Sequence, residues 1–425
     1  MASDTTTLRP CRRKRARNLL LTATIILIIA VCSLFLDYNT NPDMDEITTT
    51  ITRYPHISTL PPELVPNSSN GRRLIIIGDV HGHLKALRAL LAEAEFSTSR
   101  DTVIFTGDMV NKGADSAGVV DLAMQIGAYG VRGNHEHRVL GAWRREHRRQ
   151  QHRTNENKDS ITNEEKKEEE DNTDEAAEEE EEVETHSTDL ATASSLKHRH
   201  RTWLSSLPLI LRIGNLGSRY GGRVLVVHAG LVPGVPLEKQ DPHAVMNMRT
   251  LLSPRSRTRT GIEIETEPFP NQDQDQDQVV LLQTPIENEN ENENENTTQV
   301  LVPTPTRDGK PWAKQWTLFQ KSLPRKSSRA TVVYGHDAKA GLRMRRYAFG
   351  LDSGCAKGNK LTGVIFEVGD GDGAGKMSEY EDEDGSDWDR NRDESDHGDY
   401  EHARKKKKGP RIRHKLVSVS CAEAS

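Results

Sequence analysis

Groups able to bind metal ions stand directly after short apolar runs at five places in the sequence. The run LIII leads into GDVHGH, TVIF into TGDMVNKG and GAYGV into RGNHEH, while RVLVV leads into HAG and TVVY into GHDA. These signatures supply two carboxylates, one amide oxygen and three imidazoles: Asp79, His81, Asp108, Asn134, His228 and His336. Oxygen and nitrogen ligands without a thiolate suit zinc, manganese or iron, and two ions sharing a bridging carboxylate need about this many groups. The pattern therefore predicts a metal site.

The elements that must position these groups alternate along the chain. Apolar runs of four to five residues rich in Val and Ile are typical of buried strands. Between them, apolar residues recur at helical spacing over 84–94 and 119–126. Strand and helix in alternation predict an α/β domain, in which ligands gather beyond the carboxyl ends of strands. A single histidine at a strand end is usually structural, but five strand ends that each carry a ligand type favour a site.

Composition indicates one folded domain with long polar insertions. Of the 425 residues, 34% are hydrophobic and 29% are charged, and the net charge of −6 is the sum of large blocks of both signs. We expect disordered segments at 154–190, 253–311 and 370–412, followed by a last strand within 413–425. The net charge predicts no partner by itself, and we expect no nucleic acid partner.

The N-terminal part predicts a membrane anchor. Residues 19–36 form an uncharged apolar run that would be ~27 Å long as a helix, enough for a bilayer core. A cleaved signal peptide is the alternative, but this run ends in SLFLD rather than in small residues. The basic flank at 1–18 is expected to stay cytoplasmic, so the linker 37–71 and the domain 72–369 would be translocated.

Two further features bear on translocation. Asn67 and Asn296 begin Asn-X-Ser/Thr tripeptides, which are acceptors for N-glycosylation. Only Cys355 and Cys421 would lie on the far side of the membrane. We therefore expect no disulfide framework, although these two cysteines could form one pair.

The motifs GDVHG, GDMVNKG, GNHE, HAG and GH, in this order, resemble the phosphoprotein-phosphatase type of calcineurin-like metallophosphatase over roughly residues 72–369 without the insertions. The resemblance implies a mixed α/β (α+β) fold: a β-sandwich flanked by helices that holds two divalent ions at strand ends. Zinc is the expected metal, with manganese or cobalt as alternatives. By motif, Asp79 and His81 would hold the first ion and Asp108 would bridge. Asn134, His228 and His336 would bind the second ion.

The same resemblance suggests how phosphate is handled. His135 matches the proton donor of the family, and Lys112, Arg132 and Arg249 would hold phosphoryl oxygens. The family motif GDxVDRG is changed here, because Asn111 replaces its Asp and Lys112 replaces its Arg. An amide can orient the ring of His135 but stabilises imidazolium less well, which suits a phosphate leaving group. Lys112 offers a point charge that can follow repeating phosphates.

The expected substrate follows from the branch of the family and from the anchor. YGHDA at 334–338 and LDSGCAKGNKLTGVIFE at 351–367 resemble the branch around bacterial diadenosine tetraphosphatases. A membrane-anchored, lumen-facing member is similar to the zinc-dependent endopolyphosphatases of fungal vacuoles. We therefore expect cleavage of phosphoanhydride bonds in inorganic polyphosphate, in a vacuole or another endomembrane compartment. A dinucleoside polyphosphate hydrolase and a serine/threonine protein phosphatase remain the alternatives.

Overall fold

Two mixed sheets form the centre of the protein, whose computed structural model describes residues 55–159, 187–252, 301–369 and 411–422. The first sheet has the strand order β14-β13-β2-β3-β4, the second β1-β5-β6-β10-β12-β11 and a small third sheet β8-β7-β9. In the first sheet the strands are β2 (Arg73–Ile77), β3 (Asp101–Phe105), β4 (Tyr129–Gly130), β13 (Lys360–Gly369) and β14 (Arg411–Ser420). In the second they are β1 (Ile57–Thr59), β5 (Ile210–Gly214), β6 (Arg223–Val227), β10 (Ala330–Tyr334), β11 (Arg343–Arg345) and β12 (Ala348–Gly350). The third contains β7 (Thr250–Leu252), β8 (Val302–Thr304) and β9 (Lys310–Pro311).

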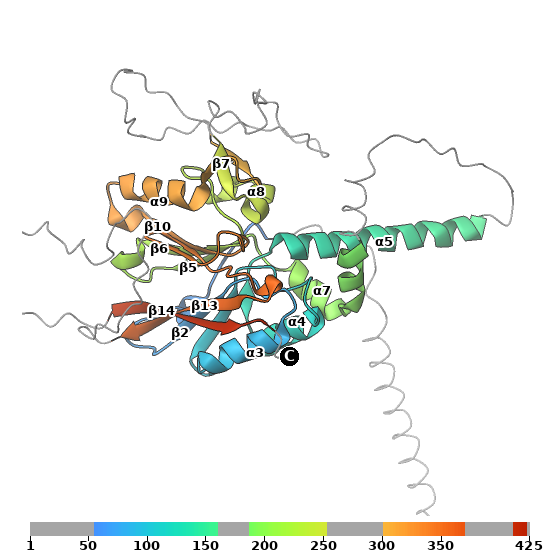
Figure 1. Cartoon of the computed structure of the whole chain (residues 1–425), viewed down its shortest axis with the longest axis horizontal. Coiled ribbons are helices and arrows are strands. Elements are labelled where there is room, and N and C mark those ends of the chain that lie inside the picture. Colours follow the sequence, from blue (N-terminus) through green and yellow to red (C-terminus); the bar gives the residue numbers. More distant parts are fainter. Residues whose placement is uncertain (1–54, 160–186, 253–300, 370–410, 423–425) are drawn as a thin grey trace, which may run out of the picture. The chain divides into compact units, whose positions relative to one another are not determined.

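Helices cover the outer faces of the two large sheets (Figure 1). The α-helices are α3 (Leu84–Glu93), α4 (Ser116–Gln125), α5 (Asn134–Asp159), α7 (His198–Ser205), α8 (Pro242–Asn247) and α9 (Trp312–Ser322). Short 3-10 helices lie at η1 (Pro62–Leu64), η2 (Ser218–Tyr220), η3 (Leu237–Lys239), η4 (Lys326–Ser328) and η5 (Cys355–Lys357). The two predicted helical stretches become α3 and α4, with α3 against β13 and β14 and α9 against the second sheet.

The main core lies between the two large sheets. Ile76 of β2 and Val364 of β13 meet Val226 of β6, Val333 of β10 and Phe349 of β12, and all five side chains are fully buried. Burial on both faces explains why these strands are continuous apolar runs instead of alternating ones. The fold is thus a mixed α/β sandwich of two large sheets with flanking helices, as the resemblance implies.

The strand register brings the polar signatures together. β2 and β3 pair in parallel with Ile77 opposite Phe105, and β6 and β10 pair in parallel with Val226 opposite Val333. The chain therefore leaves each pair of strands at one edge of its sheet. A backbone hydrogen bond from Gly335 N to the carbonyl of His228, at 2.9 Å, joins the loops that follow β6 and β10.

The ends of the segments expected to be disordered are in part helix and strand. Residues 154–159 belong to α5, and 187–190 begin a helical stretch over 187–195. The predicted disordered segment 253–311 is wrong at its C-terminal end, because β8 and β9 pair with β7. Residues 411–412 already belong to β14, which supplies the strand expected near the C-terminus. The remaining parts, 160–186, 253–300 and 370–410, lie outside the described residues.

The N-terminal predictions fall largely outside the described residues, since these begin at 55. That holds for the tail 1–18, the span 19–36 and most of the linker 37–71. Among the helices that the structure describes, none is long and apolar enough to cross a bilayer. The end of the predicted linker is part of the fold, because β1 pairs with β5 and places Ile57 opposite Ile210.

The possible cysteine pair is formed. Cys355 in η5 is disulfide-bonded to Cys421, which follows β14 and is 66 residues away in sequence. The backbone N–H of Cys421 also donates to the carbonyl of Asn359 at 2.8 Å. The end of the last strand is therefore fixed to the loop that precedes β13 by a disulfide and by a hydrogen bond.

Candidate metal centre

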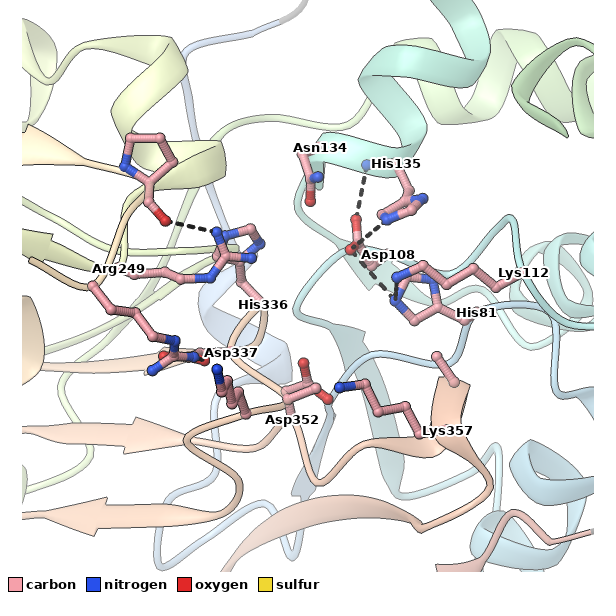
Figure 2. A pocket seen from close by; sticks show the side chains of 15 residues that line it. His81, Asp108, Lys112, Asn134, His135, Arg249, His336, Asp337, Asp352 and Lys357 are labelled. Atoms are coloured by element: carbon pink, nitrogen blue, oxygen red, sulfur yellow. Dashed lines mark hydrogen bonds and ion pairs between the residues drawn. The ribbon is translucent and has the colours of Figure 1, made fainter. Parts of the chain in front are cut away.

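The carboxylate of Asp108 faces three imidazoles, of which His81 and His135 are shown beside it in Figure 2. Its Oδ2 is 3.6 Å from Nε2 of His81, 3.4 Å from Nε2 of His228 and 3.9 Å from Nε2 of His135. Asp108 comes from the end of β3 and the three rings from three other segments, and all four side chains are buried. A carboxylate approached by ligands from several sides is what a bridging ligand requires.

Two groups of potential ligands share Asp108. One consists of His81, Asp108 and His135, the other of Asp108, His228 and His336, and within each group the donor atoms lie within 4.8 Å of one another. The amide oxygen of Asn134 lies 3.0 Å from Nε2 of His228, within reach of the second group. The structure thus brings these predicted ligands together. It also places His135, which the resemblance gives as a proton donor, within the first group.

Asp79 is buried beside a second carboxylate, that of Asp352. Its oxygens accept the backbone N–H of His336 at 3.0 and 3.2 Å. Burial raises the pKa of Asp79 well above its ordinary value, and the nearby Asp352 and Asp108 raise it further. Burial also raises the pKa of Asp352, a residue that sequence reasoning missed although it stands in the LDSGC segment. Neighbouring buried carboxylates resist ionisation unless a cation is present, so this donor set fits divalent ions.

Backbone carbonyls fix the orientation of the ligand rings. Nδ1 of His81 lies 3.2 Å from the carbonyl of Val110, and Nδ1 of His228 lies 2.9 Å from that of Thr106. In His336 it is Nε2 that lies near a carbonyl, at 3.0 Å from Asn247. An N–H donated to a carbonyl leaves the other ring nitrogen as an acceptor that faces the site. Burial lowers the pKa of His81 to about 4, which favours the neutral form needed for a ligand.

Strained backbone is concentrated in the site. Within the part of the chain that the structure describes, six non-glycine residues have positive φ, and five of them are site residues: His81, Asp108, Asn111, Lys112 and His336. Such conformations cost free energy and persist where the surroundings enforce them. The site is also crowded at Gly335, because a Cβ atom there would lie 1.9 Å from Oδ1 of Asp79.

The pocket over the ligands is lined by basic side chains. Lys112 and Arg249, both predicted, point into it (Figure 2). Arg307, Lys339 and Lys357 line it as well. Sequence reasoning missed Arg307 because it falls inside the segment expected to be disordered. Arg307 lies between β8 and β9, which both pair with β7, and in the pocket it forms an ion pair with Asp337.

The structure does not bring Arg132 into the pocket. Its side chain is fully buried, and Nη2 donates to the carbonyls of Leu204 at 3.3 Å and Ser205 at 2.6 Å. The guanidinium therefore holds α7 in place, and the arrangement does not support a phosphate contact. Next to GNHE, a buried structural arginine and a phosphate ligand look the same in sequence.

Asn111 also has a different contact from the one expected. Its Nδ2 donates to Oδ1 of Asp189 at 2.5 Å, and it makes no hydrogen bond to His135 among those found in the described residues. Instead, Nδ1 of His135 lies 3.3 Å from Nη2 of Arg138. Burial lowers the pKa of His135 to about 3, with Arg138 among the cations that contribute.

The comparisons with known proteins agree with this geometry. The model of the calcineurin-like phosphoesterase family matches residues 72–365. Over 70 residues the chain is 43% identical to the symmetrical bis(5'-nucleosyl)-tetraphosphatase of Photorhabdus laumondii. This match covers 16% of this chain and 26% of that protein. Over 75 residues it is 35% identical to serine/threonine-protein phosphatase 1 of Salmonella typhimurium. This second match covers 18% of this chain and 35% of that protein.

A solved structure provisionally assigned as a diadenosine tetraphosphatase is 28% identical, with a TM-score of 0.44, and the match covers 73% of this chain and 94% of that one. The two curated relatives are matched over only about a quarter to a third of their own length, 26% and 35%. The family match, in contrast, spans most of the folded part. The chain belongs to the calcineurin-like phosphoesterase family and is a metallophosphoesterase.

Proposed function

We propose that this site hydrolyses phosphoanhydride bonds in a linear chain of phosphates. The observation that carries the proposal is a buried cluster of metal ligands beneath a pocket lined by five basic side chains: Lys112, Arg249, Arg307, Lys339 and Lys357. Fixed cations beside a metal cluster stabilise the charge that develops on phosphoryl oxygens. Several of them in one pocket suit a substrate that carries several adjacent phosphates.

Two divalent ions would be held by the residues already described. Asp79 and His81 would hold one ion, Asn134, His228 and His336 would hold the other, and Asp108 would contact both. When bound, such ions supply Lewis-acid polarisation of the phosphoryl group and of a nucleophilic water. Zinc fits the mixed oxygen and nitrogen donors, and manganese or cobalt would fit them too.

The side chains of the pocket perform the remaining tasks. Lys112 and Arg249 would orient the phosphoryl oxygens, because both line the pocket that contains the ligands. His135 also lines it and would hydrogen-bond to the leaving oxygen through Nε2, the nitrogen that faces Asp108. A leaving phosphate is a much weaker base than a serine alkoxide, so it requires less protonation.

The lining of the pocket supports inorganic polyphosphate as substrate. Among the lining residues, all of which belong to the described ranges, there is no phenylalanine, tyrosine or tryptophan. Nucleobases are commonly held by stacking on such rings. A pocket that is rich in cations and has none of these three aromatic side chains in its lining fits a bare chain of phosphates.

The named relatives support the second candidate, a dinucleoside polyphosphate, better than they support polyphosphate. The Photorhabdus relative is a bis(5'-nucleosyl)-tetraphosphatase, and the same name recurs among other matching bacterial proteins. Since the match covers 26% of that protein, its substrate is a hypothesis for this chain. The Salmonella relative adds a phosphoprotein as the third substrate to test.

A direct competition of substrates tests the proposal. The full-length chain, purified in detergent and loaded with zinc, manganese or cobalt, would be given long-chain polyphosphate, diadenosine tetraphosphate and a phosphoserine peptide. Turnover of polyphosphate above the other two, with intermediate lengths on gels, supports internal cutting of polyphosphate. Preference for the dinucleotide establishes the second candidate. Preference for the peptide refutes anhydride specificity, and the His228→Ala variant controls for contaminating activity.

We also propose that the domain works in the lumen of a vacuole or a related endomembrane compartment, anchored by residues 19–36. Two observations support this placement. The disulfide Cys355–Cys421 is of a kind that persists in oxidising compartments. Asn67 of the first glycosylation tripeptide is exposed. Protease protection in sealed vesicles, together with a glycosidase-sensitive mass at Asn67, would test it, and digestion of the domain from outside would refute it.

A further inference from the structure

We propose that Asp189 and Arg138 are positioning residues for His135: Asp189 fixes Arg138, and Arg138 contacts the ring. The inference rests on the proposed phosphohydrolase site and deepens it. Asp189 lies at the end of the acidic insertion, in the helical stretch 187–195. In a run so rich in acidic residues nothing in the sequence distinguishes it. The structure does, because its side chain is almost fully buried, with 4% exposed.

Asp189 is held by two partners at once. Its Oδ2 accepts Nε of Arg138 at 3.1 Å, and its Oδ1 accepts Nδ2 of Asn111 at 2.5 Å. Nη2 of Arg138 also lies 3.4 Å from Oδ1. An arginine fork on a carboxylate fixes the plane of the guanidinium more firmly than a single contact does. Thr192 completes the arrangement by donating its hydroxyl to Oδ1 of Asn111 at 3.3 Å.

The fixed guanidinium in turn determines the orientation of His135. Arg138 follows His135 by one helical turn of α5, and its Nη2 lies 3.3 Å from Nδ1 of the ring. A guanidinium has no acceptor, so Nδ1 must accept and the proton of the neutral ring is on Nε2. Nε2 faces Asp108 at 3.9 Å and lies on the pocket side. The ring therefore presents a hydrogen-bond donor to the place where the leaving oxygen would be.

This arrangement has a consequence for specificity. A neutral imidazole can donate a hydrogen bond to a leaving oxygen, but it is a poor source of a full proton. A leaving phosphate or nitrophenolate needs little more than that bond, whereas a strongly basic alkoxide needs a proton. Asp189 and Arg138 thus favour weakly basic leaving groups, in agreement with the proposed anhydride substrates.

The alternative is that the pair only attaches the helix of 187–195 to α5. In that case loss of Asp189 would lower stability and affect all substrates equally. A positioning role requires instead that the loss depends on His135 and on the leaving group. These two dependences separate the explanations, because a structural contact has no reason to distinguish one leaving group from another.

The test is a double-mutant cycle on the full-length, metal-loaded chain. Asp189→Asn changes the charge but not the size of the side chain. The kcat of this variant would be measured with and without the second substitution His135→Ala, on p-nitrophenyl phosphate and on phenyl phosphate. We expect Asp189→Asn to lower kcat about tenfold in the wild-type background, and to have little effect once His135 is absent. Arg138→Lys, which keeps the charge but loses the fork, should show the same dependence. Asp121→Asn, which weakens the contacts of Asp121 with Arg199 and His200, is the matched control and should leave kcat unchanged.

The proposal would be overturned if Asp189→Asn lowered kcat equally with and without His135. It would also be overturned if the ratio of kcat for the two aryl phosphates did not change. Circular dichroism shows whether a variant is folded, and metal analysis shows whether it is loaded. If Asp189→Asn is unfolded or lacks metal, Arg138→Lys takes its place in the cycle. Aryl phosphates also separate this inference from the proposed substrate. If the chain cleaves them but no anhydride, the proposed function fails while the cycle still tests Asp189.

Discussion

Oε2 of Glu136 accepts the backbone N–H of Asp108 at 2.8 Å, and its Oε1 accepts that of Met109 at 2.7 Å. The same carboxylate accepts the N–H of Gly133 at 2.9 Å, and its side chain is fully buried. One anion therefore holds the loop after β3 against the loop that begins α5. Glu136 belongs to the GNHE motif, so the sequence contained the signal for a role that ligand types alone did not suggest.

Replacing Glu136 by glutamine should weaken metal binding. The amide offers only one acceptor, and its NH2 group would face backbone N–H donors that the carboxylate now satisfies. We expect metal affinity to fall 10- to 100-fold, as is typical when groups supporting ligands are lost. Competition with a chelator dye measures it. Glu93→Gln, at the exposed end of α3, is the control, and equal affinity in the two variants would contradict the role of Glu136.

The cluster of candidate ligands could be predicted because each member belongs to a short motif at the end of an apolar run. Strand ends converge at a sheet edge whatever connects them, so Asp108, His228 and His336 meet although they are far apart in sequence. The sandwich itself came from the resemblance, since buried strands of one sheet or of two have the same apolar pattern.

The residues that were missed depend on long-range placement. Asp189 is one acidic residue in an acidic run, and only its burial against Asn111 sets it apart. Arg307 reaches the pocket through the pairing of β8 and β9 with β7, in a stretch whose composition predicts disorder. Arg132 was misplaced for the converse reason, because a motif gives residue type and position but not the direction of the side chain.

Metal analysis of two variants separates metal ligands from the residue that would contact the leaving oxygen. Asp79→Asn should lose about one ion per chain, because an amide cannot offset the positive charge of the ion as a buried carboxylate does. His135→Ala should keep both ions and lose most turnover. This outcome is informative because His135 lies as close to Asp108 as a ligand would. Loss of an ion from His135→Ala would make this histidine a ligand and contradict the predicted role.

The disulfide should contribute substantially to stability. Cys355 and Cys421 close a loop over a sequence separation of 66 residues, for which chain entropy predicts about 4 kcal/mol. We expect the Cys355→Ala, Cys421→Ala double variant to lower the free energy of unfolding in urea by about that amount. The loss should also raise KM, because Lys357 of the pocket belongs to the same short helix as Cys355. Wild-type protein treated with a reductant is the control and should behave like the variant.

His414 should make the protein less stable in acid. Burial lowers its pKa from 6.5 to about 4, with Arg219 adding to the effect. The folded chain therefore keeps this ring neutral while the unfolded chain binds a proton below pH 6.5. Stability contributed by the neutral ring is present above pH 6.5, is lost as the pH falls toward 4, and does not change further below that. The loss is up to about 3 kcal/mol at 1.36 kcal/mol per pKa unit.

The His414→Gln variant isolates this effect from other groups that titrate. Nδ1 of His414 lies 2.9 Å from the hydroxyl of Tyr220, and a glutamine oxygen could accept from that hydroxyl without titrating. Unfolding in urea between pH 7 and pH 4 should show a shallower loss of stability in this variant than in the wild type. His198→Gln, at an exposed position in α7, should keep the wild-type slope. If all three proteins lose stability equally over this range, His414 is not the group that titrates.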